Sequence, residues 1–93
     1  MSTEVIRDDE RSRYQLTVDD MEVGFADFVI DGDRVVLPHT VIDPARRGRG
    51  LAAVLVAAAL DDIRSSGRTV LPTCWYVAEF IQAHPAYGDL LAD

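Results

Sequence analysis

The chain has 93 residues, of which 48% are hydrophobic, so it can form one domain with a core and is not a disordered tail. Sixteen acidic residues against nine basic ones give a net charge of −7, which argues against a basic nucleic-acid-binding surface. Residues 1–14 lack the apolar segment of a signal peptide, and the apolar run 51–60 is too short to span a bilayer. We therefore expect a single cytoplasmic domain, 1–93, that binds neither nucleic acid nor membrane. One cysteine and two histidines, far apart in the sequence, predict no metal site.

The first half of the chain has the pattern of antiparallel strands. Strands are predicted over 5–7, 13–18, 21–30 and 34–42, from alternating or β-rich composition. An Asp-Gly step at 31–32 is a strong hairpin signal. Pro38 lies inside the last of these strands and predicts an edge, a bulge or a bend there.

The second half of the chain alternates between helix and strand. Apolar residues every four positions predict a helix from about 48 to 66 that is buried on more than one side. A short strand, 69–73, and a second amphipathic helix, 75–84, follow, and Pro85 ends that helix. The order β-β-β-β-α-β-α predicts a parallel strand pair joined by a crossover helix. Ligands of such sheets bind near the N-terminus of that helix.

The loop that precedes the long helix concentrates positive charge and glycine. It contains Arg46, Arg47, Gly48, Arg49 and Gly50. The first turn of a helix leaves about four N–H groups unpaired, and the helix dipole adds positive potential there. Glycine lets an anion approach the backbone, and arginine adds bidentate donors, so the loop suits a phosphate or pyrophosphate. The alternative is a simple turn with solubilising arginines. The pattern is neither a Walker loop nor the dinucleotide fingerprint.

These residues resemble a known family. "RGRGLA", 47–52, is similar to the Q/R-x-x-G-x-G/A loop of the GNAT superfamily of acetyl-CoA-dependent N-acetyltransferases. "HT" at 39–40 and "PTCWYVAEFIQAHPAY" at 72–87 resemble a small, minimal GNAT subfamily, and the similarity covers nearly the whole chain. The resemblance implies a reduced GNAT fold of the α/β (α+β) class. An antiparallel β-meander would be followed by β-α-β-α, with strands 34–42 and 69–73 splayed apart.

The resemblance also implies a place for the cosubstrate. The pantetheine arm of acetyl-CoA would lie in the gap between the splayed strands, hydrogen-bonded to the main chain of Val41 and Ile42. Its pyrophosphate would contact the arginine–glycine loop and the first helical turn. The residues implied are Arg46, Arg47, Gly48, Arg49, Gly50, Leu51 and Ala52.

Three residues are candidates for the chemistry that the resemblance implies, the direct attack of an amine on the thioester. Cys74 would be a nucleophile, a donor to the leaving thiolate, or part of the pocket wall. Tyr76 would protonate the thiolate, or would be a core aromatic. His39 would be a general base, or would only satisfy backbone groups near Pro38. Relatives usually carry Glu where this chain has Val41, which removes one carboxylate expected near the acceptor.

The sequence leaves the acceptor and the assembly open. The acceptor amine would belong to a small molecule or to a protein, and the protein would be a monomer or a homodimer. Two other functions fit the same residues, namely a non-catalytic acyl-CoA sensor and an interaction domain whose loop binds nothing. We expect the segment from His84 to Tyr87 to stop the last helix and pack the C-terminal tail, Trp75 to pack or to line the pocket, and Glu79 to be solvated.

Overall fold

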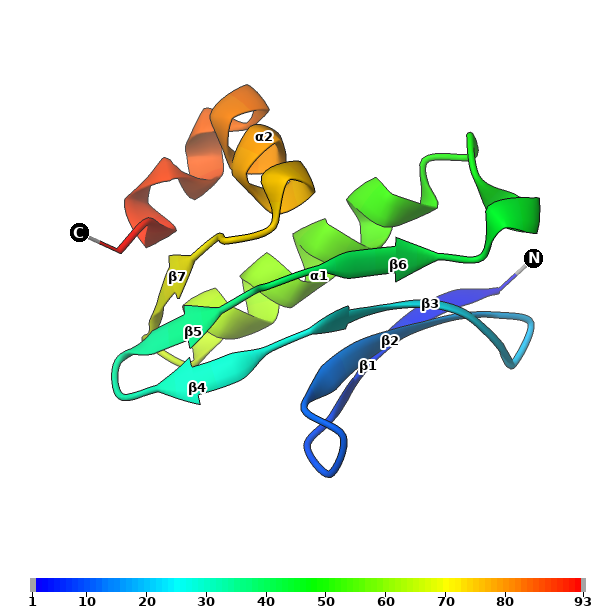
Figure 1. The fold of residues 1–93 in the computed structure, drawn as a ribbon, viewed down its shortest axis with the longest axis horizontal. Helices are drawn as coiled ribbons and strands as arrows, with labels where there is room; N and C mark the ends of the chain where they lie inside the picture. Colours follow the sequence, from blue (N-terminus) through cyan, green and yellow to red (C-terminus); the bar gives the residue numbers. More distant parts are fainter. Residues whose placement is uncertain (1, 93) are drawn as a thin grey trace.

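A computed structural model describes residues 2–92 of the chain (Figure 1). The seven strands are β1 (Thr3–Asp8), β2 (Arg13–Val18), β3 (Met21–Asp27), β4 (Val29–Asp31), β5 (Arg34–Val36), β6 (Thr40–Ile42) and β7 (Thr69–Leu71). The two helices are α1 (Leu51–Ser65) and α2 (Trp75–Ala83), and 3-10 turns occupy Pro44–Arg46 and Pro85–Leu90. The predicted strand and helix order is present, but two predicted strands are each divided into two. In residues 2–92, no helix is long and apolar enough to cross a membrane.

The division of the long strands creates two sheets. One sheet has the order β1-β2-β3-β6 and the other has the order β4-β5-β7. The predicted strand 21–30 breaks at Phe28, whose buried ring packs on Tyr14 with ring centroids 5.2 Å apart. The predicted strand 34–42 breaks around Pro38, which has no N–H to offer to a ladder. The β4–β5 hairpin therefore joins β7, while β6 returns to β3.

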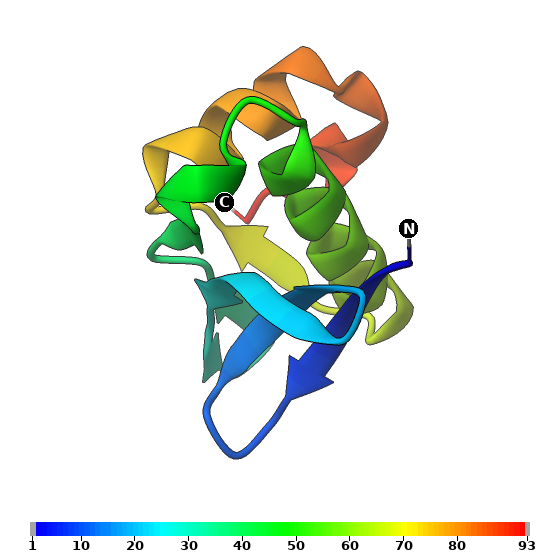
Figure 2. The ribbon, with the colours of Figure 1, turned by 90° about the vertical axis from the view of Figure 1, so that its right-hand side faces the viewer.

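Helix α1 crosses one face of the strands and supplies much of the core (Figure 2). The four residues that predicted this helix, Leu51, Leu55, Ala59 and Ile63, are all buried. The helix begins at Leu51 rather than near residue 48, because Gly48 and Gly50 have φ angles of +83° and +73°. These left-handed conformations are incompatible with a right-handed helical turn.

The predicted splay lies where β6 leaves β5. β5 and β7 are parallel neighbours, and the ladder continues through Leu37 N–H to the Leu71 carbonyl, 3.1 Å, and Cys74 N–H to the Leu37 carbonyl, 3.0 Å. Beyond that point β6 pairs with β3 instead. Gly24 allows this pairing to be close, since a Cβ there would lie 2.7 Å from the Val41 carbonyl oxygen. The strands thus diverge immediately before the loop that leads into α1.

Candidate active site

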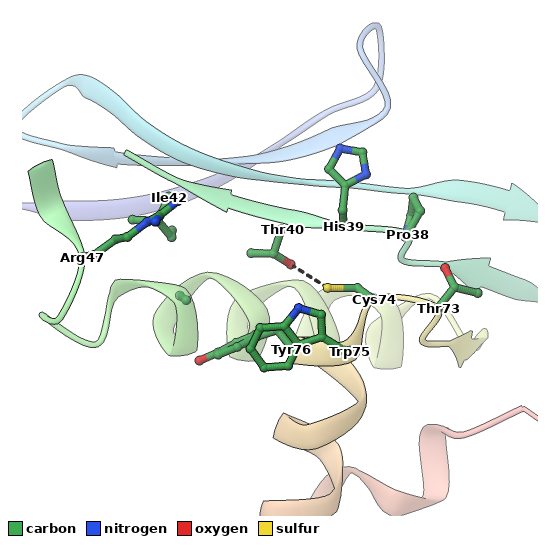
Figure 3. Close-up of a pocket in the computed structure, with 10 residues that line it drawn as sticks. Pro38, His39, Thr40, Ile42, Arg47, Thr73, Cys74, Trp75 and Tyr76 are labelled. Atoms are coloured by element: carbon green, nitrogen blue, oxygen red, sulfur yellow. Dashed lines mark hydrogen bonds between the residues drawn. The ribbon is translucent and has the colours of Figure 1, made fainter. Parts of the chain in front are cut away.

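A cavity of about 440 Å³ occupies the splay between β6 and the β7–α2 junction (Figure 3). It is lined by Pro38, His39, Thr40, Ile42, Arg47, Ala52, Thr73, Cys74, Trp75 and Tyr76. The cavity therefore brings together the three predicted catalytic candidates, two of which lie more than 30 residues from the third in the sequence. It also reaches the loop, through Arg47 and Ala52.

Cys74 lies at the inner wall of this cavity. It immediately precedes α2 and is buried, and its Sγ lies 3.9 Å from Thr40 Oγ1. The imidazole of His39 points away from the thiol, on the other side of β6 (Figure 3). The structure therefore places Thr40, and not the His39 ring, beside the cysteine. The sequence analysis did not single out Thr40, because only the strand divergence brings it to the α2 junction.

Tyr76 stands on the first turn of α2 and lines the cavity from the helix side. Burial raises the pKa of its phenol, so the hydroxyl keeps its proton at neutral and mildly alkaline pH. Its neighbour Trp75 also lines the cavity, but its side chain is 73% exposed. Trp75 is therefore a cavity wall open to solvent and does not pack in the core.

His39 lies on the face of β2, β3 and β6 that is opposite α1, which we term the outer face. Alternation along β2 and the β2–β3–β6 register put Arg13, Phe25, Asp27, His39 and Val41 on this face. His39 Nε2 lies 2.6 Å from Asp27 Oδ2, and the imidazole meets the Phe25 ring edge-on. The sequence analysis missed Asp27, because only the strand register makes it a neighbour of His39.

The arginine–glycine loop leaves donors free at the start of α1. The first helical hydrogen bond runs from Val54 N–H to the Gly50 carbonyl, and no side chain caps the helix. Within residues 2–92, the N–H groups of Leu51, Ala52 and Ala53 therefore have no protein partner. A Cβ placed on Gly48 or Gly50 would meet nothing within 4 Å, so the space beside these two glycines is open.

The arginines of the loop differ from most others in the chain. Five arginines form salt bridges, namely Arg7, Arg11, Arg13, Arg34 and Arg64. In the described part of the chain, Arg46, Arg47 and Arg49 form none. Their positive charge thus remains available at the site where the helix dipole is also positive.

A second cavity, of about 220 Å³, joins the loop to the splay. It is lined by the loop residues Arg46, Arg47, Gly48 and Gly50 together with Leu51. Both cavities share Ile42, Arg47, Ala52 and Tyr76 as lining residues, so they form one continuous groove. This groove has free amides and arginines without salt bridges at one end and Cys74 at the other, an arrangement with room for an extended molecule.

The main chain of β6 faces this groove at alternate residues. Val41 pairs with Phe25, and the flanking bonds are Asp27 N–H to the His39 carbonyl, 3.2 Å, and Asp43 N–H to the Val23 carbonyl, 2.7 Å. By antiparallel alternation, the N–H and C=O of Val41 point to β3, whereas those of Thr40 and Ile42 point away from it. The Val41 main chain, from which contacts to the cosubstrate were expected, is therefore occupied by β3, and the main-chain groups that point to the groove are those of Thr40 and Ile42.

The C-terminal segment that the resemblance included has structural contacts. His84 stacks on Phe80 with ring centroids 4.1 Å apart, and its Nδ1 lies 2.7 Å from the Phe80 carbonyl oxygen. The Tyr87 hydroxyl donates to Asp61, 3.0 Å, and its ring packs on Phe80. Residues 2–92 contain no group of three or more His, Cys, Asp or Glu residues that could hold a metal ion.

Comparison with known proteins defines the class of this chain. Residues 13–90 match the family described as GCN5-related N-acetyl-transferase, and the chain belongs to that family. Protein NATD1 from Bos taurus is 38% identical over 82 residues, which are 82% of this chain and 71% of NATD1. The chain is thus an acyltransferase of the acetyl-CoA-dependent N-acetyltransferase class, a family that acts on amines.

Solved structures share the fold at low sequence identity. A GCN5-like protein from Staphylococcus aureus superimposes with a TM-score of 0.73 at 14% identity, over 96% of this chain and 87% of that one. The ribosomal-protein-S18-alanine N-acetyltransferase from Escherichia coli gives a TM-score of 0.61 at 23% identity, over 64% of this chain. This chain spans only 39% of that enzyme. The reduced GNAT fold that the sequence predicted is confirmed.

Proposed function

We propose that this protein transfers the acetyl group of acetyl-CoA to a primary amine at the splay between β6 and the β7–α2 junction. The observation that carries the proposal is the continuous groove from the arginine–glycine loop to Cys74. A groove with anion-binding groups at one end and a mostly apolar cavity at the other matches the two ends of this cosubstrate.

The loop would hold the diphosphate. The free N–H groups of the first α1 turn donate to phosphate oxygens, and the glycines allow close approach. Guanidinium groups add charge-assisted hydrogen bonds. The residues assigned to this role are Arg46, Arg47, Gly48, Arg49, Gly50, Leu51 and Ala52. Along the groove, the outward main-chain groups of Thr40 and Ile42 would pair with the pantetheine amides.

The chemistry requires a proton donor and a proton acceptor from the chain. When bound, acetyl-CoA supplies an activated acetyl thioester. Tyr76 would give its proton to the departing sulfur, a role that suits a phenol kept neutral by burial. Cys74 would line the thioester pocket and donate a weak hydrogen bond from its thiol. His39 would take a proton from the acceptor, and the Ile42 N–H would stabilise negative charge on oxygen, a donor typically worth about 3–4 kcal/mol.

The acceptor is expected to be a cationic amine of a small molecule or a protein. A net charge of −7 favours a positive partner in a general way. Val41 replaces the glutamate expected after His-Thr and lies on the outer face, so any acidic attraction near the acceptor must come from other residues. A cytoplasmic location, a monomer or homodimer, and a lack of nucleic-acid, membrane or metal binding stay predictions.

Titration calorimetry and a transfer assay on the full chain test the proposal together. Calorimetry measures acetyl-CoA binding, and chromatography follows CoA release with spermidine, Nα-acetyl-lysine amide or a peptide with a free N-terminus. We expect binding, together with CoA release that depends on the amine. Binding without release on any amine would contradict transfer and favour the acyl-CoA sensor. No binding at millimolar acetyl-CoA would contradict both functions.

A further inference from the structure

We propose that Asp27 is a positioning residue that orients His39 as the proton acceptor for the incoming amine, and that the acceptor arrives from the outer face. The inference rests on the proposed function and adds to it a residue pair and a direction of approach. No metal or second cosubstrate is needed for this step.

The pair is well defined by geometry. His39 Nε2 lies 2.6 Å from Asp27 Oδ2, the distance of a close contact between an imidazole and a carboxylate. The Asp27 side chain is 23% exposed, whereas that of His39 is 57% exposed. A partly buried carboxylate thus contacts one nitrogen of a mostly exposed ring on the outer face, and residue His39 also borders the cavity.

The contact selects one tautomer of the imidazole. A carboxylate only accepts hydrogen bonds, so Nε2 must carry the proton that is shared with Asp27. In the neutral ring, Nδ1 is then the atom with the free lone pair. A carboxylate that orients an imidazole and stabilises its protonated form is a recurrent device of enzymes that use histidine as a base.

The groups around this pair support it and do not compete for His39. Arg13 on β2 has its Nε 3.5 Å from Asp27 Oδ1, and its guanidinium lies over the Phe25 ring, 3.9 Å from the centroid. The arginine therefore contacts the second carboxylate oxygen and leaves the first to His39. The other titratable side chains that line the cavity are those of Arg47, Cys74 and Tyr76.

The two faces of the sheet then have separate roles. Loop 44–50, the α1 N-terminus and Tyr76 all lie on the α1 side of β6, where the groove runs (Figure 3). His39 and Asp27 lie on the outer face, and His39 also lines the same cavity. A cosubstrate held on the α1 side leaves the outer face open for the acceptor. An ammonium group that enters there meets the carboxylate and the imidazole first.

The proton transfer balances as follows. One N–H bond of the acceptor ammonium breaks, its electron pair stays on nitrogen, and an N–H bond forms at His39 Nδ1. The imidazolium then keeps its Nε2 contact with the Asp27 carboxylate as an ion pair. It returns the extra proton to solvent before the next turnover, so no oxidant, reductant or further reactant is consumed.

The first test reads the tautomers in the protein without any cosubstrate. The chain has only two histidines, and His84 directs Nδ1, not Nε2, to a carbonyl oxygen. Long-range ¹H–¹⁵N spectra should therefore show His39 protonated at Nε2 and His84 protonated at Nδ1. Asp27→Asn should disturb only the His39 signals. A His39 protonated at Nδ1, or spectra that Asp27→Asn leaves unchanged, would overturn the pairing.

The second test measures kcat with whichever of the three amines the wild type acetylates. Asp27→Asn and His39→Gln should each lower kcat at pH 7.5 by about 10- to 100-fold, with little change in the KM for acetyl-CoA. In the His39→Gln background, Asp27→Asn should not lower kcat further, because Asp27 acts by orienting the His39 imidazole. Asp31→Asn, which changes the carboxylate paired with Arg34 in the β4–β5 hairpin, is the matched control and should retain full rate.

Raising the pH separates a proton acceptor from a structural contact. At pH 9.5 the neutral fraction of a lysine-like amine is about 100-fold higher than at pH 7.5. Because less of the amine then needs a proton acceptor, the kcat of both variants should come closer to that of the wild type. An equal deficit at both pH values, or additive effects in the double variant, would overturn the inference while the proposed function stands. A wild type that acetylates none of the amines would remove the proposed function, and the acceptor role of His39 with it.

Discussion

The β4–β5 hairpin and the turn before α1 both place a left-handed glycine near arginine, but only the turn before α1 leaves the neighbouring hydrogen-bond donors free. Gly32 in the β4–β5 hairpin has φ +59°, and Gly50 before α1 has φ +73°. A Cβ on either glycine would meet nothing within 4 Å. The two turns therefore have similar backbone freedom and similar exposure.

The turns differ in what their polar groups already contact. In the hairpin, Arg34 pairs with Asp31 at 2.9 Å, and Arg68 donates to the Gly32 carbonyl at 3.3 Å. Before α1, the amides of the first helical turn have no protein partner in residues 2–92, and Arg46, Arg47 and Arg49 form no salt bridge there. Glycine alone thus indicates a turn, whereas glycine beside unsatisfied donors supports the anion-binding role that we propose for the loop.

The largest expected effect is a difference in acetyl-CoA affinity between two variants that carry the same substitution, one in each turn. Gly50→Glu should weaken acetyl-CoA binding by at least about 100-fold, because a carboxylate would face the phosphates at the helix N-terminus. Gly32→Glu should leave the affinity unchanged. Both variants should lose a similar stability, about 1–2 kcal/mol, because each places a side chain at positive φ. Calorimetry and chemical denaturation measure the two quantities, and equal affinities in the two variants would refute the assignment of the loop.

The sequence predicted this loop because its signal is local. Three arginines and two glycines within 46–50, followed by a strongly apolar helix, can be recognised without knowledge of the fold. The buried positions of α1 and the hairpin at Gly32 were predictable for the same reason. Their periodicity and turn chemistry act over a few residues.

The features that the sequence did not reveal all depend on contacts between distant strands. Phe28, where the predicted strand 21–30 breaks, packs on Tyr14. The irregularity at Pro38 was predicted, but the pairing of β6 with β3 beyond it was not. The same register places Asp27 beside His39 and turns the Val41 main chain away from the groove. No local pattern carries this register, so these parts of the site required the structure.

If the loop binds acetyl-CoA and the splay carries out the transfer, a substitution at the splay should change kcat and leave the acetyl-CoA affinity unchanged. Tyr76→Phe should lower kcat by about 30- to 100-fold with an unchanged acetyl-CoA affinity, since it removes a proton donor and keeps the ring. Burial raises the pKa of the Tyr76 phenol, so the donor stays protonated as the pH increases. At pH values below the ordinary tyrosine pKa of about 10, deprotonation of Tyr76 should therefore not lower the wild-type kcat. Steady-state kinetics over pH 6–10 check this expectation, and a variant with full rate would remove Tyr76 from the mechanism.

A smaller effect should distinguish the unpaired arginines from the paired ones. Arg47 lines both parts of the groove and forms no salt bridge in the described chain, whereas Arg34 is paired with Asp31. Arg47→Ala should weaken acetyl-CoA binding by about 10-fold, the loss of a charge-assisted hydrogen bond, and should reduce the dependence of the affinity on salt. Arg34→Ala should change neither quantity. Calorimetry at two salt concentrations compares the two variants. Equal losses of acetyl-CoA affinity in Arg47→Ala and Arg34→Ala would show that the location of the charge is unimportant.

The smallest effect concerns Cys74, which also precedes a helix but in a different environment. Unlike Gly50, it has an extended backbone, is buried, and contacts Thr40 at 3.9 Å rather than open solvent. In direct transfer, its thiol lines the pocket and donates only weakly to the departing sulfur, so Cys74→Ala should lower kcat by about three- to tenfold. The acetyl-CoA affinity should persist, because the loop that holds the phosphates is unchanged. Complete loss of activity in Cys74→Ala, together with an acetylated cysteine in the wild type detected by intact-protein mass spectrometry, would contradict direct transfer and make the thiol the nucleophile.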